Sequence, residues 1–270
     1  MTLLEKITAK SAQANGLSFM EFMQLALYAP AQGYYSANLT KLGPAGDFIT
    51  APEMTPLFGK ALANQCQQVL HSLHAPCILE FGAGTGILCV DVLSHLEHLQ
   101  CLPECYYILE VSSNLRHRQQ ELIQQKIPHL ASKVCWLDEW PKHPFNGVII
   151  ANEVLDAMPI HRFMRTEEQV YESYIFCNEQ QQLEEQFQVS TNQRLVDYVN
   201  NHVPYQDGPY VSEVNLFIND WINNLYAMLN KGAVFLIDYG FPRHEYYHPD
   251  RQQGTIMCHY QHQSHTNPLM

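Results

Sequence analysis

The sequence predicts a doubly wound α/β fold, in which a parallel sheet carries helices on both faces. Two observations lead to this prediction. From Cys77 onward, short apolar runs alternate with helical patterns. The runs are almost continuously apolar, as is typical of parallel strands buried on both faces. We expect strands at 77–81, 106–111, 134–137, 147–151 and 233–239, and helices at 87–97, 114–125 and 216–229.

Two segments lie outside this alternation. Residues 1–76 hold two apolar patterns of helical spacing around a stretch rich in Gly and Pro, which predicts a helical cap or lid. Residues 160–211 are rich in Glu and Gln, and we expect an inserted hairpin or small subdomain beside the site. The α/β domain would then consist of residues 77–159 and 212–270.

Charge and hydropathy argue against two classes of partner. The chain has 15 Lys and Arg against 27 Asp and Glu, a formal net charge of −12, whereas nucleic acid binding needs clustered cations. No apolar run approaches the roughly 18 residues of a membrane-spanning helix. The amino terminus carries neither a secretory signal nor an Arg-rich transit pattern, so we expect a cytoplasmic protein.

A glycine-rich turn follows the first predicted strand. Gly82, Gly84 and Gly86 form a G-x-G-x-G pattern directly after Glu80 and Phe81. Glycines there let a ligand approach the backbone at the carboxyl edge of the sheet. Dinucleotide sites favour G-x-G-x-x-G/A, whereas here a bulky isoleucine follows the last glycine. The spacing therefore favours S-adenosylmethionine, a cofactor without phosphate, with Glu80 just before the loop.

Acidic residues follow the second and third predicted strands. Glu110 stands at the end of the second strand, where a carboxylate can accept hydrogen bonds from both ribose hydroxyls. NAD sites use the same arrangement, so Glu110 alone does not choose the cofactor. Asp138 stands where the adenine edge would lie and could accept from its amino group; a surface turn is the alternative.

Polar residues also end the fourth strand. Asn152, Glu153 and Asp156 come at the carboxyl end of the predicted central strand, where a methyl acceptor would have to lie. Methyl transfer needs a positioned nucleophile, and carboxylates can hold a guanidinium by charge-assisted hydrogen bonds. Glu153 and Asp156 are thus candidates, although Glu153 could instead cap the next helix.

A polar turn, GDFITAPE at 46–53, precedes the second predicted helix of the cap. Ordinary capping by Thr50 or Glu53 would explain it. With this turn, however, a series of motifs extends along the chain: MEFMQLALYAPAQGYYS, GDFITAPEMTPLFGKALA, ILEFGAGTGIL, YYILEVS, ANEVLDAMPIHRF and FLIDYG. In this order they resemble the MidA-type methyltransferases, a family that includes a mitochondrial assembly-factor methyltransferase of respiratory complex I.

The resemblance implies a class I, Rossmann-like methyltransferase fold with an amino-terminal helical extension. It implies methylation of a protein arginine, with a complex I subunit as the family's substrate. Gly82, Gly84, Gly86 and Glu110 would bind S-adenosylmethionine. Asp47, Thr50 and Pro52 would close over it, and Asn152, Glu153 and Asp156 would face the acceptor.

Family members continue beyond residue 270 through strands that complete the sheet. We therefore expect the antiparallel edge pair to be missing and an apolar strand edge to be exposed near 234–237, on a truncated chain or one covered by a second copy in a homodimer. Cys258, His259, His262 and His265 suggest zinc, but no second ligand pair accompanies them, so we expect no metal site.

Two other classes of function stay open. A nicotinamide-dependent oxidoreductase would share the strand–glycine turn, although the bulky residue after Gly86 and the GDFITAPE turn count against it. A non-catalytic assembly protein would keep the cofactor fold, but a Glu153→Ala change would leave the maturation of its partner unaffected.

Overall fold

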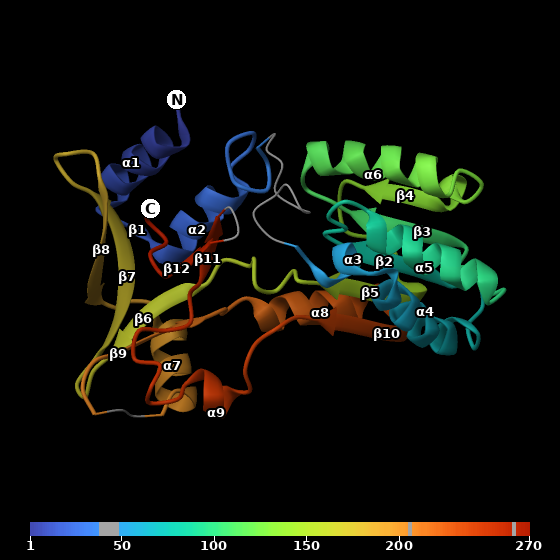
Figure 1. The fold of residues 1–270 in the computed structure, drawn as a ribbon. Coiled ribbons are helices and arrows are strands. Elements are labelled where there is room, and N and C mark those ends of the chain that lie inside the picture. Colours follow the sequence, from blue (N-terminus) through green and yellow to red (C-terminus); the bar gives the residue numbers. More distant parts are fainter. Residues whose placement is uncertain (38–48, 205–206, 261–262) are drawn as a thin grey trace.

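The computed structural model describes residues 1–37, 49–204, 207–260 and 263–270. Two sheets form two neighbouring halves of the molecule (Figure 1). No helix in this described part of the chain is long and apolar enough to cross a membrane.

The first sheet has five parallel strands in the order β10-β5-β2-β3-β4. The chain runs outward from β2 to β4 and then returns to add β5 and β10 on the other side of β2. The switch point between β2 and β5 is where open α/β sheets bind ligands, at the carboxyl ends of the strands. The strands are β2 Cys77–Phe81, β3 Cys105–Leu109, β4 Val134–Leu137, β5 Phe145–Asn152 and β10 Leu229–Ile237.

Helices cover both faces of this sheet, which confirms the doubly wound fold. Leu62 and Leu93, from two helices, pack with Ile78 and Ile150 on one face, whereas Leu225 packs on the other. Each such aliphatic side chain contributes about 1.5–3 kcal/mol by leaving water. The helices concerned are α4 Pro56–Leu70, α5 Ile87–His98 and α6 Ser113–Lys126 on the first face and α8 Ile218–Met228 on the second.

At three of the boundaries that differ from the prediction, a side chain forms a hydrogen bond with the backbone where the strand ends or the helix begins. The strand expected to continue to residue 111 stops at Leu109, where the Glu110 carboxylate accepts the Ser112 N–H at 2.8 Å. The next helix starts one residue early, at Ser113, capped by Ser112. β10 ends at Ile237 instead of residue 239, because Asp238 Oδ1 accepts the Tyr239 N–H at 2.9 Å.

A second, antiparallel sheet contains most of the segment expected as an insertion. Its strands are ordered β1-β7-β6-β9, with β8 on the far side of β7. Helix α7 covers one face through Leu195 and Val199. The elements are β1 Leu17–Ser18, β6 His161–Arg165, β7 Val170–Cys177, β8 Leu183–Val189, α7 Gln193–His202 and β9 Tyr210–Val214.

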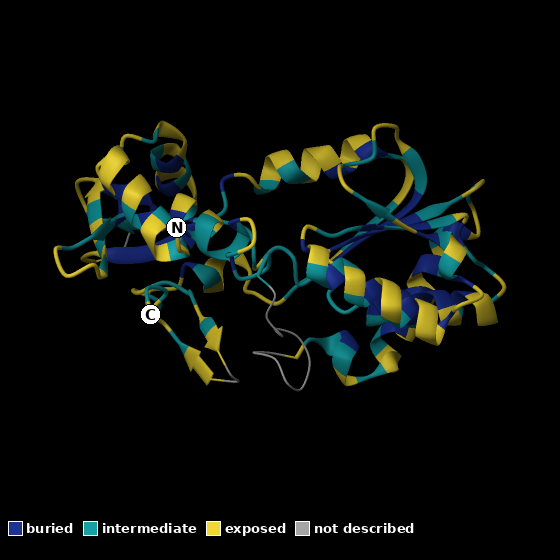
Figure 2. Ribbon diagram, turned by 90° about the horizontal axis from the view of Figure 1, so that it is seen from above, coloured by how far each residue is buried: buried dark blue, intermediate teal, exposed yellow. Residues whose placement is uncertain are grey.

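The described parts of residues 1–76 are divided between the two sheets. Helices α1 (Leu3–Ala14) and α2 (Phe19–Tyr28) pack with β7 around Ile175, and the Ser11 hydroxyl donates to the Ile175 carbonyl at 2.8 Å. Helix α4 packs on the parallel sheet instead, next to the short α3 (Ala51–Met54). Buried strands form the interior of both halves, and the outer helix faces are exposed (Figure 2).

Among the described residues, no further strand pairs with the outer edge of β10, and Leu236 is 38% exposed. In the final segment, after the one-turn helix α9 (Arg243–Tyr246), the short strands β11 (Cys258–Tyr260) and β12 (Gln263–His265) pair antiparallel. His262 lies outside the described residues, within which no three His, Cys, Asp or Glu side chains group as metal ligands.

Candidate active site

The glycine turn connects β2 to α5 at the switch point of the parallel sheet. Gly82, Gly84 and Gly86 have φ values of +62°, +55° and +90°, a region that L side chains rarely adopt. The Gly86 N–H donates to the Ala83 carbonyl at 2.8 Å and closes the turn. A Cβ atom at Gly86 would lie 3.2 Å from Gln119, so the glycine also lets α5 and α6 approach each other.

Glu110 lies at the carboxyl end of β3, and two donors orient its carboxylate. Oε1 accepts the Ser112 N–H at 2.8 Å, and Oε2 accepts from Gln119 Nε2 at 3.1 Å. The same Gln119 nitrogen donates to the Gly84 carbonyl at 2.9 Å. The structure thus brings Glu110 and the glycine turn together through a residue that the sequence analysis missed.

Glu80 is 2% exposed and lies within the sheet layer, where the Tyr106 hydroxyl donates to its Oε2 at 2.8 Å. Burial raises the pKa of Glu80 to about 7, against the lowering effect of that hydrogen bond. Asp138 follows β4 with its side chain 86% exposed and paired with Arg116 at 2.5 Å. Contact of either carboxyl with a cofactor stays a prediction.

Of the GDFITAPE turn, Asp47 lies outside the described residues. Thr50 is the N-cap of α3 but makes no side-chain capping bond within the described structure, and Pro52 is buried. The Glu53 carboxylate accepts from the Thr85 hydroxyl of the glycine turn, so it does not serve its own helix start. The backbone amide of Ala51 lowers the pKa of Glu153, so the start of α3 lies near the end of β5 as well as near the glycine turn.

The residues expected to face the acceptor lie where β5 ends. Asn152 is the last residue of β5, and Glu153 follows with φ +49°, its N–H donating to the Ile237 carbonyl at 2.8 Å. Asp238, at the end of the neighbouring β10, accepts the N–H groups of Leu155 and Asp156 at 3.1 and 3.2 Å. These bonds hold the segment after β5 against the end of β10.

Two tyrosines adjoin these carboxylates. The Tyr239 hydroxyl donates to Asp156 Oδ2 at 2.5 Å. Tyr28 of α2 donates to the Ala157 carbonyl at 2.8 Å and stacks on Tyr35, with ring centroids 5.5 Å apart. Burial, followed by the charges of Asp156 and Glu110, raises the pKa of Tyr28 to about 12. Tyr28 therefore lies near both the predicted cofactor acid and the predicted acceptor acid.

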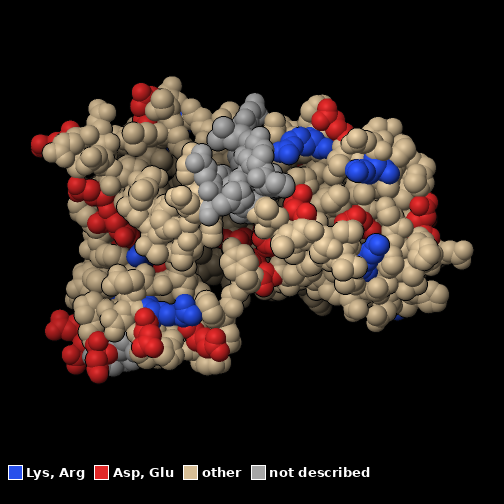
Figure 3. Space-filling model, in the orientation of Figure 1, with Lys and Arg blue, Asp and Glu red and all other residues tan. Residues whose placement is uncertain are grey.

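The carboxylates of Glu153, Asp156 and Asp238 form a cluster in which like charges repel one another. The pKa of Glu153 is raised by burial and then by Asp156 and Asp238, and the pKa of Asp238 is raised by burial and then by Asp156. In the space-filling view, acidic side chains gather in the hollow where the two halves meet (Figure 3). The cluster is thus suited to a positively charged group.

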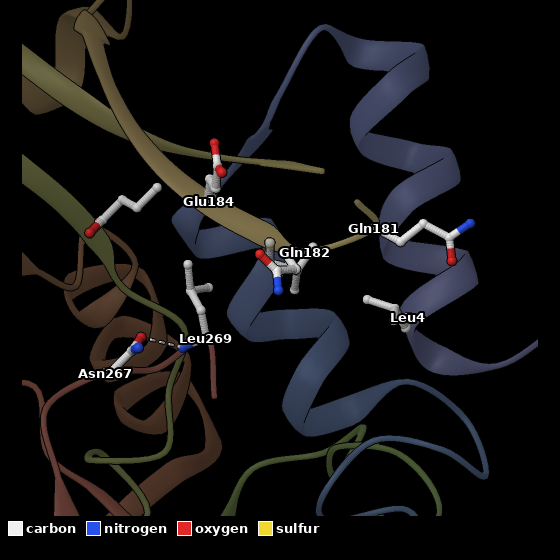
Figure 4. A pocket seen from close by; sticks show the side chains of 8 residues that line it. Leu4, Gln181, Gln182, Glu184, Asn267 and Leu269 are labelled. Atoms are coloured by element: carbon white, nitrogen blue, oxygen red, sulfur yellow. Dashed lines mark hydrogen bonds between the residues drawn. The ribbon is translucent and has the colours of Figure 1, made fainter. Parts of the chain in front are cut away.

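A cavity of about 530 Å³ opens between α2 and the segment after β3. Tyr28 lines it, opposite Val111, whose side chain is 71% exposed although it follows Glu110 directly. A volume of this size suits a small organic ligand. A second cavity, of about 630 Å³, lies between Leu4, the β7–β8 turn and Leu269 (Figure 4). None of the described residues predicted from the sequence to bind cofactor or acceptor is among the residues that line either cavity, but the first adjoins Glu110 through Val111.

A glycine turn at the switch point and a carboxylate at the end of the next strand define an α/β domain that binds a nucleotide-like cofactor at its carboxyl edge. The chain belongs to the family described as "putative S-adenosyl-L-methionine-dependent methyltransferase", which matches residues 61–270. The resemblance drawn from the motifs and the class I methyltransferase fold are thereby confirmed.

Solved structures and curated relatives agree with this assignment. A protein of Burkholderia thailandensis solved bound to S-adenosyl-homocysteine is 37% identical, with a TM-score of 0.93 over 99% of this chain and 70% of that one. A native structure from the same organism is 36% identical, with a TM-score of 0.89 and coverage of 99% and 68%.

Among the curated relatives, protein arginine methyltransferase NDUFAF7, mitochondrial, of Danio rerio is 30% identical over 189 residues, 62% of this chain and 44% of that protein. Its Xenopus laevis counterpart is 28% identical over 267 residues, 88% of this chain and 60% of that protein. The chain thus spans about half the length of these relatives.

Proposed function

We propose that this chain transfers a methyl group from S-adenosylmethionine to a guanidinium nitrogen of an arginine in a protein. One observation carries the proposal: Glu153, Asp156 and Asp238 converge with Tyr28 at the ends of β5 and β10, beside the glycine turn. The names of the curated relatives and the acidic charge of the chain support it.

We infer that Gly82, Gly84, Gly86 and Glu110 hold the cofactor, with Thr50, Pro52 and Asp47 closing over it. When bound, S-adenosylmethionine supplies an electrophilic methyl group on a sulfonium. The Glu53 carboxylate is bonded to Thr85, next to the start of α5. This carboxylate would repel a pyrophosphate bound there, whereas it would attract a cofactor that carries a positive charge. This contact favours S-adenosylmethionine over a nicotinamide dinucleotide.

At the acceptor side, Glu153 and Asp156 hold the guanidinium by charge-assisted hydrogen bonds, and Asn152 lines the approach. Like charges raise the pKa values of Glu153 and Asp238, and a bound cation would lower them again. Carboxylates that accept the N–H groups of two guanidinium nitrogens leave the third nitrogen free to bond to the methyl carbon. The bond from that carbon to sulfur would break, S-adenosylhomocysteine would leave, and the Glu153 carboxylate would take the proton that the nitrogen loses. Transfer at that nitrogen follows from this positioning.

The acceptor protein, the oligomeric state and the cellular location are the remaining parts of the proposal. We expect an arginine-bearing protein as acceptor, and a respiratory complex I subunit, from the motif resemblance, stays a prediction. Pairing of two copies through the edge of β10 likewise stays a prediction, which the oligomeric state in solution would test. The cytoplasmic location also stays a prediction, and the curated relatives are named as mitochondrial.

The test is methyl transfer followed by identification of the methylated amino acid. The chain is incubated with S-adenosylmethionine carrying a tritiated methyl group and an extract of host cells lacking the gene, and the proteins are hydrolysed. We expect label in methylarginine, strongly reduced by Asp156→Asn and unchanged by Glu168→Gln, an exposed acid remote from the cluster. Label in another amino acid, or equal labelling by Asp156→Asn, would refute the proposal.

A further inference from the structure

Gln119 is a fully buried amide in the middle of α6, a helix whose other polar residues mostly face solvent. It makes three hydrogen bonds to three different elements. Its Nε2 donates to the Gly84 carbonyl of the glycine turn at 2.9 Å and to Glu110 Oε2 after β3 at 3.1 Å. Its Oε1 accepts from Trp136 Nε1 of β4 at 2.9 Å.

The tryptophan fixes which way the amide points. An indole N–H can only donate, so the atom of Gln119 that faces Trp136 must be the oxygen. The NH2 group then points to Gly84 and Glu110, two groups that can only accept when the carboxyl is ionised. All three bonds are satisfied in this one orientation, and Gln119 is therefore held rigidly.

We propose that Gln119 is a positioning residue that holds Glu110 and the glycine turn in the arrangement that receives the ribose of an adenosine-type cofactor. It acts through Glu110 and Gly84 and does not itself touch the ligand. With Ser112 on Oε1 and Gln119 on Oε2, the carboxylate is fixed before the ligand arrives, so less ordering is needed on binding. This inference rests on the proposed function, because it concerns the same cofactor site.

The discriminating variant is Gln119→Glu, which keeps the size but replaces the amide donor by a carboxyl. Once this carboxyl and Glu110 have both lost their protons, the new carboxylate would face Glu110 and the Gly84 carbonyl with no proton to donate. We expect the affinity for S-adenosylhomocysteine at pH 8, measured by isothermal titration, to fall about tenfold or more. At pH 5.5 one proton shared between the two carboxyls restores a donor, and much of the affinity should return.

Gln120→Glu is the matched control, because it adds the same charge one residue away on the exposed face of α6. We expect it to bind like the unmodified chain at both pH values. Glu110 also interacts electrostatically with Glu80 from β2 and Tyr28 from α2. Arg116 of α6 forms an ion pair with Asp138 after β4. Because Glu80 titrates in this range in every variant, the unmodified chain serves as the pH reference.

Gln119→Met, which keeps the volume but cannot donate, is the second variant and replaces the first should that one not fold. We expect it to lose affinity equally at both pH values. Unmodified affinity of folded Gln119→Met would overturn the inference, as would a loss in Gln119→Glu at pH 8 without recovery at pH 5.5. Failure of the unmodified chain itself to bind S-adenosylhomocysteine would instead refute the cofactor assignment.

Discussion

Glu80 is a buried carboxyl whose ionisation opposes folding. Its pKa of about 7 in the folded chain exceeds its usual value of 4.5, so the folded state binds the proton more tightly than the unfolded state between these pH values. The stability contribution of Glu80 is therefore fully present below about pH 4.5 and is lost as the pH rises towards 7, at a cost of about 3 kcal/mol.

We predict that Glu80→Gln flattens this part of the pH dependence. The carboxamide oxygen can still accept from Tyr106, but it carries no charge at any pH. Urea unfolding at pH 5 and pH 8 should show a larger stability loss in the unmodified chain than in the variant. Equal losses in both chains would contradict the prediction.

Tyr239 provides a second test at this scale. Tyr239→Phe removes only the hydroxyl that donates to Asp156. We predict that kcat/KM for arginine methylation falls about tenfold while the affinity for S-adenosylhomocysteine is unchanged. Tyr226→Phe, at an 82% exposed position on α8, is the control. A weakened affinity of Tyr239→Phe for S-adenosylhomocysteine would contradict the prediction, because it would place this tyrosine on the cofactor side of the site.

Single residues also show how far the site could be predicted from the sequence. The positions of Glu110 and Asn152 at strand ends were predicted because such ends meet at one edge of a parallel sheet, whereas their roles stay predictions. The same reasoning applied to FLIDYG would have found Asp238. Gln119 and Tyr28 gave no such signal, because a polar residue within a polar helix and a tyrosine in an apolar helix are common, and only the tertiary contacts distinguish these two.

At the scale of elements, the parallel strands lie close together where β2, β5 and β10 begin. Gly147 of β5 has φ +147°, and a Cβ atom there would lie 1.8 Å from the Cys77 carbonyl oxygen of β2. Gly232 of β10 is in register with Gly147. Glycines here therefore permit the pairing that brings β5 and β10 next to the cofactor turn.

We predict that Gly147→Ala lowers the free energy of unfolding by about 3 kcal/mol or more, because backbone must move to accept the methyl group. Gly240→Ala is the matched control: its φ of +157° is similar, but open space surrounds the position. Chemical denaturation of both variants measures the difference. Similar stabilities would mean that the strands can separate at little cost.

Elements with strong local patterns were predicted closely, and those defined by distant pairing were not. The strands at 77–81 and 134–137 match the structure residue for residue. The two-residue β1, by contrast, exists because Leu17 and Ser18 pair with β7, more than 150 residues away. No local periodicity reveals such a pairing, so the contribution of the amino terminus to the second sheet was not foreseen.

At the scale of the whole molecule, the site joins two halves with separate cores. Helix α2 belongs to the second half, yet Tyr28 bonds Ala157 after β5 and lines the cavity opposite Val111 of the first. A ligand in that cavity would contact both halves, and its binding free energy would therefore also hold them together.

We predict that S-adenosylhomocysteine slows amide hydrogen exchange in α2, residues 19–28. Helix α7 packs on the second sheet and lines no part of the cavity, so its exchange should change little. Mass spectrometry of the exchanged chain with and without ligand compares the two helices. Slower exchange confined to the parallel-sheet half would contradict a site shared between the halves.

The most direct test of the central claim is isothermal titration of the chain with S-adenosylhomocysteine, beside NADH and repeated with Glu110→Ala. The account predicts binding of S-adenosylhomocysteine alone, with the affinity strongly reduced by the substitution because the carboxylate at the end of β3 is lost. Binding of NADH, or equal binding of S-adenosylhomocysteine by Glu110→Ala, would contradict the account.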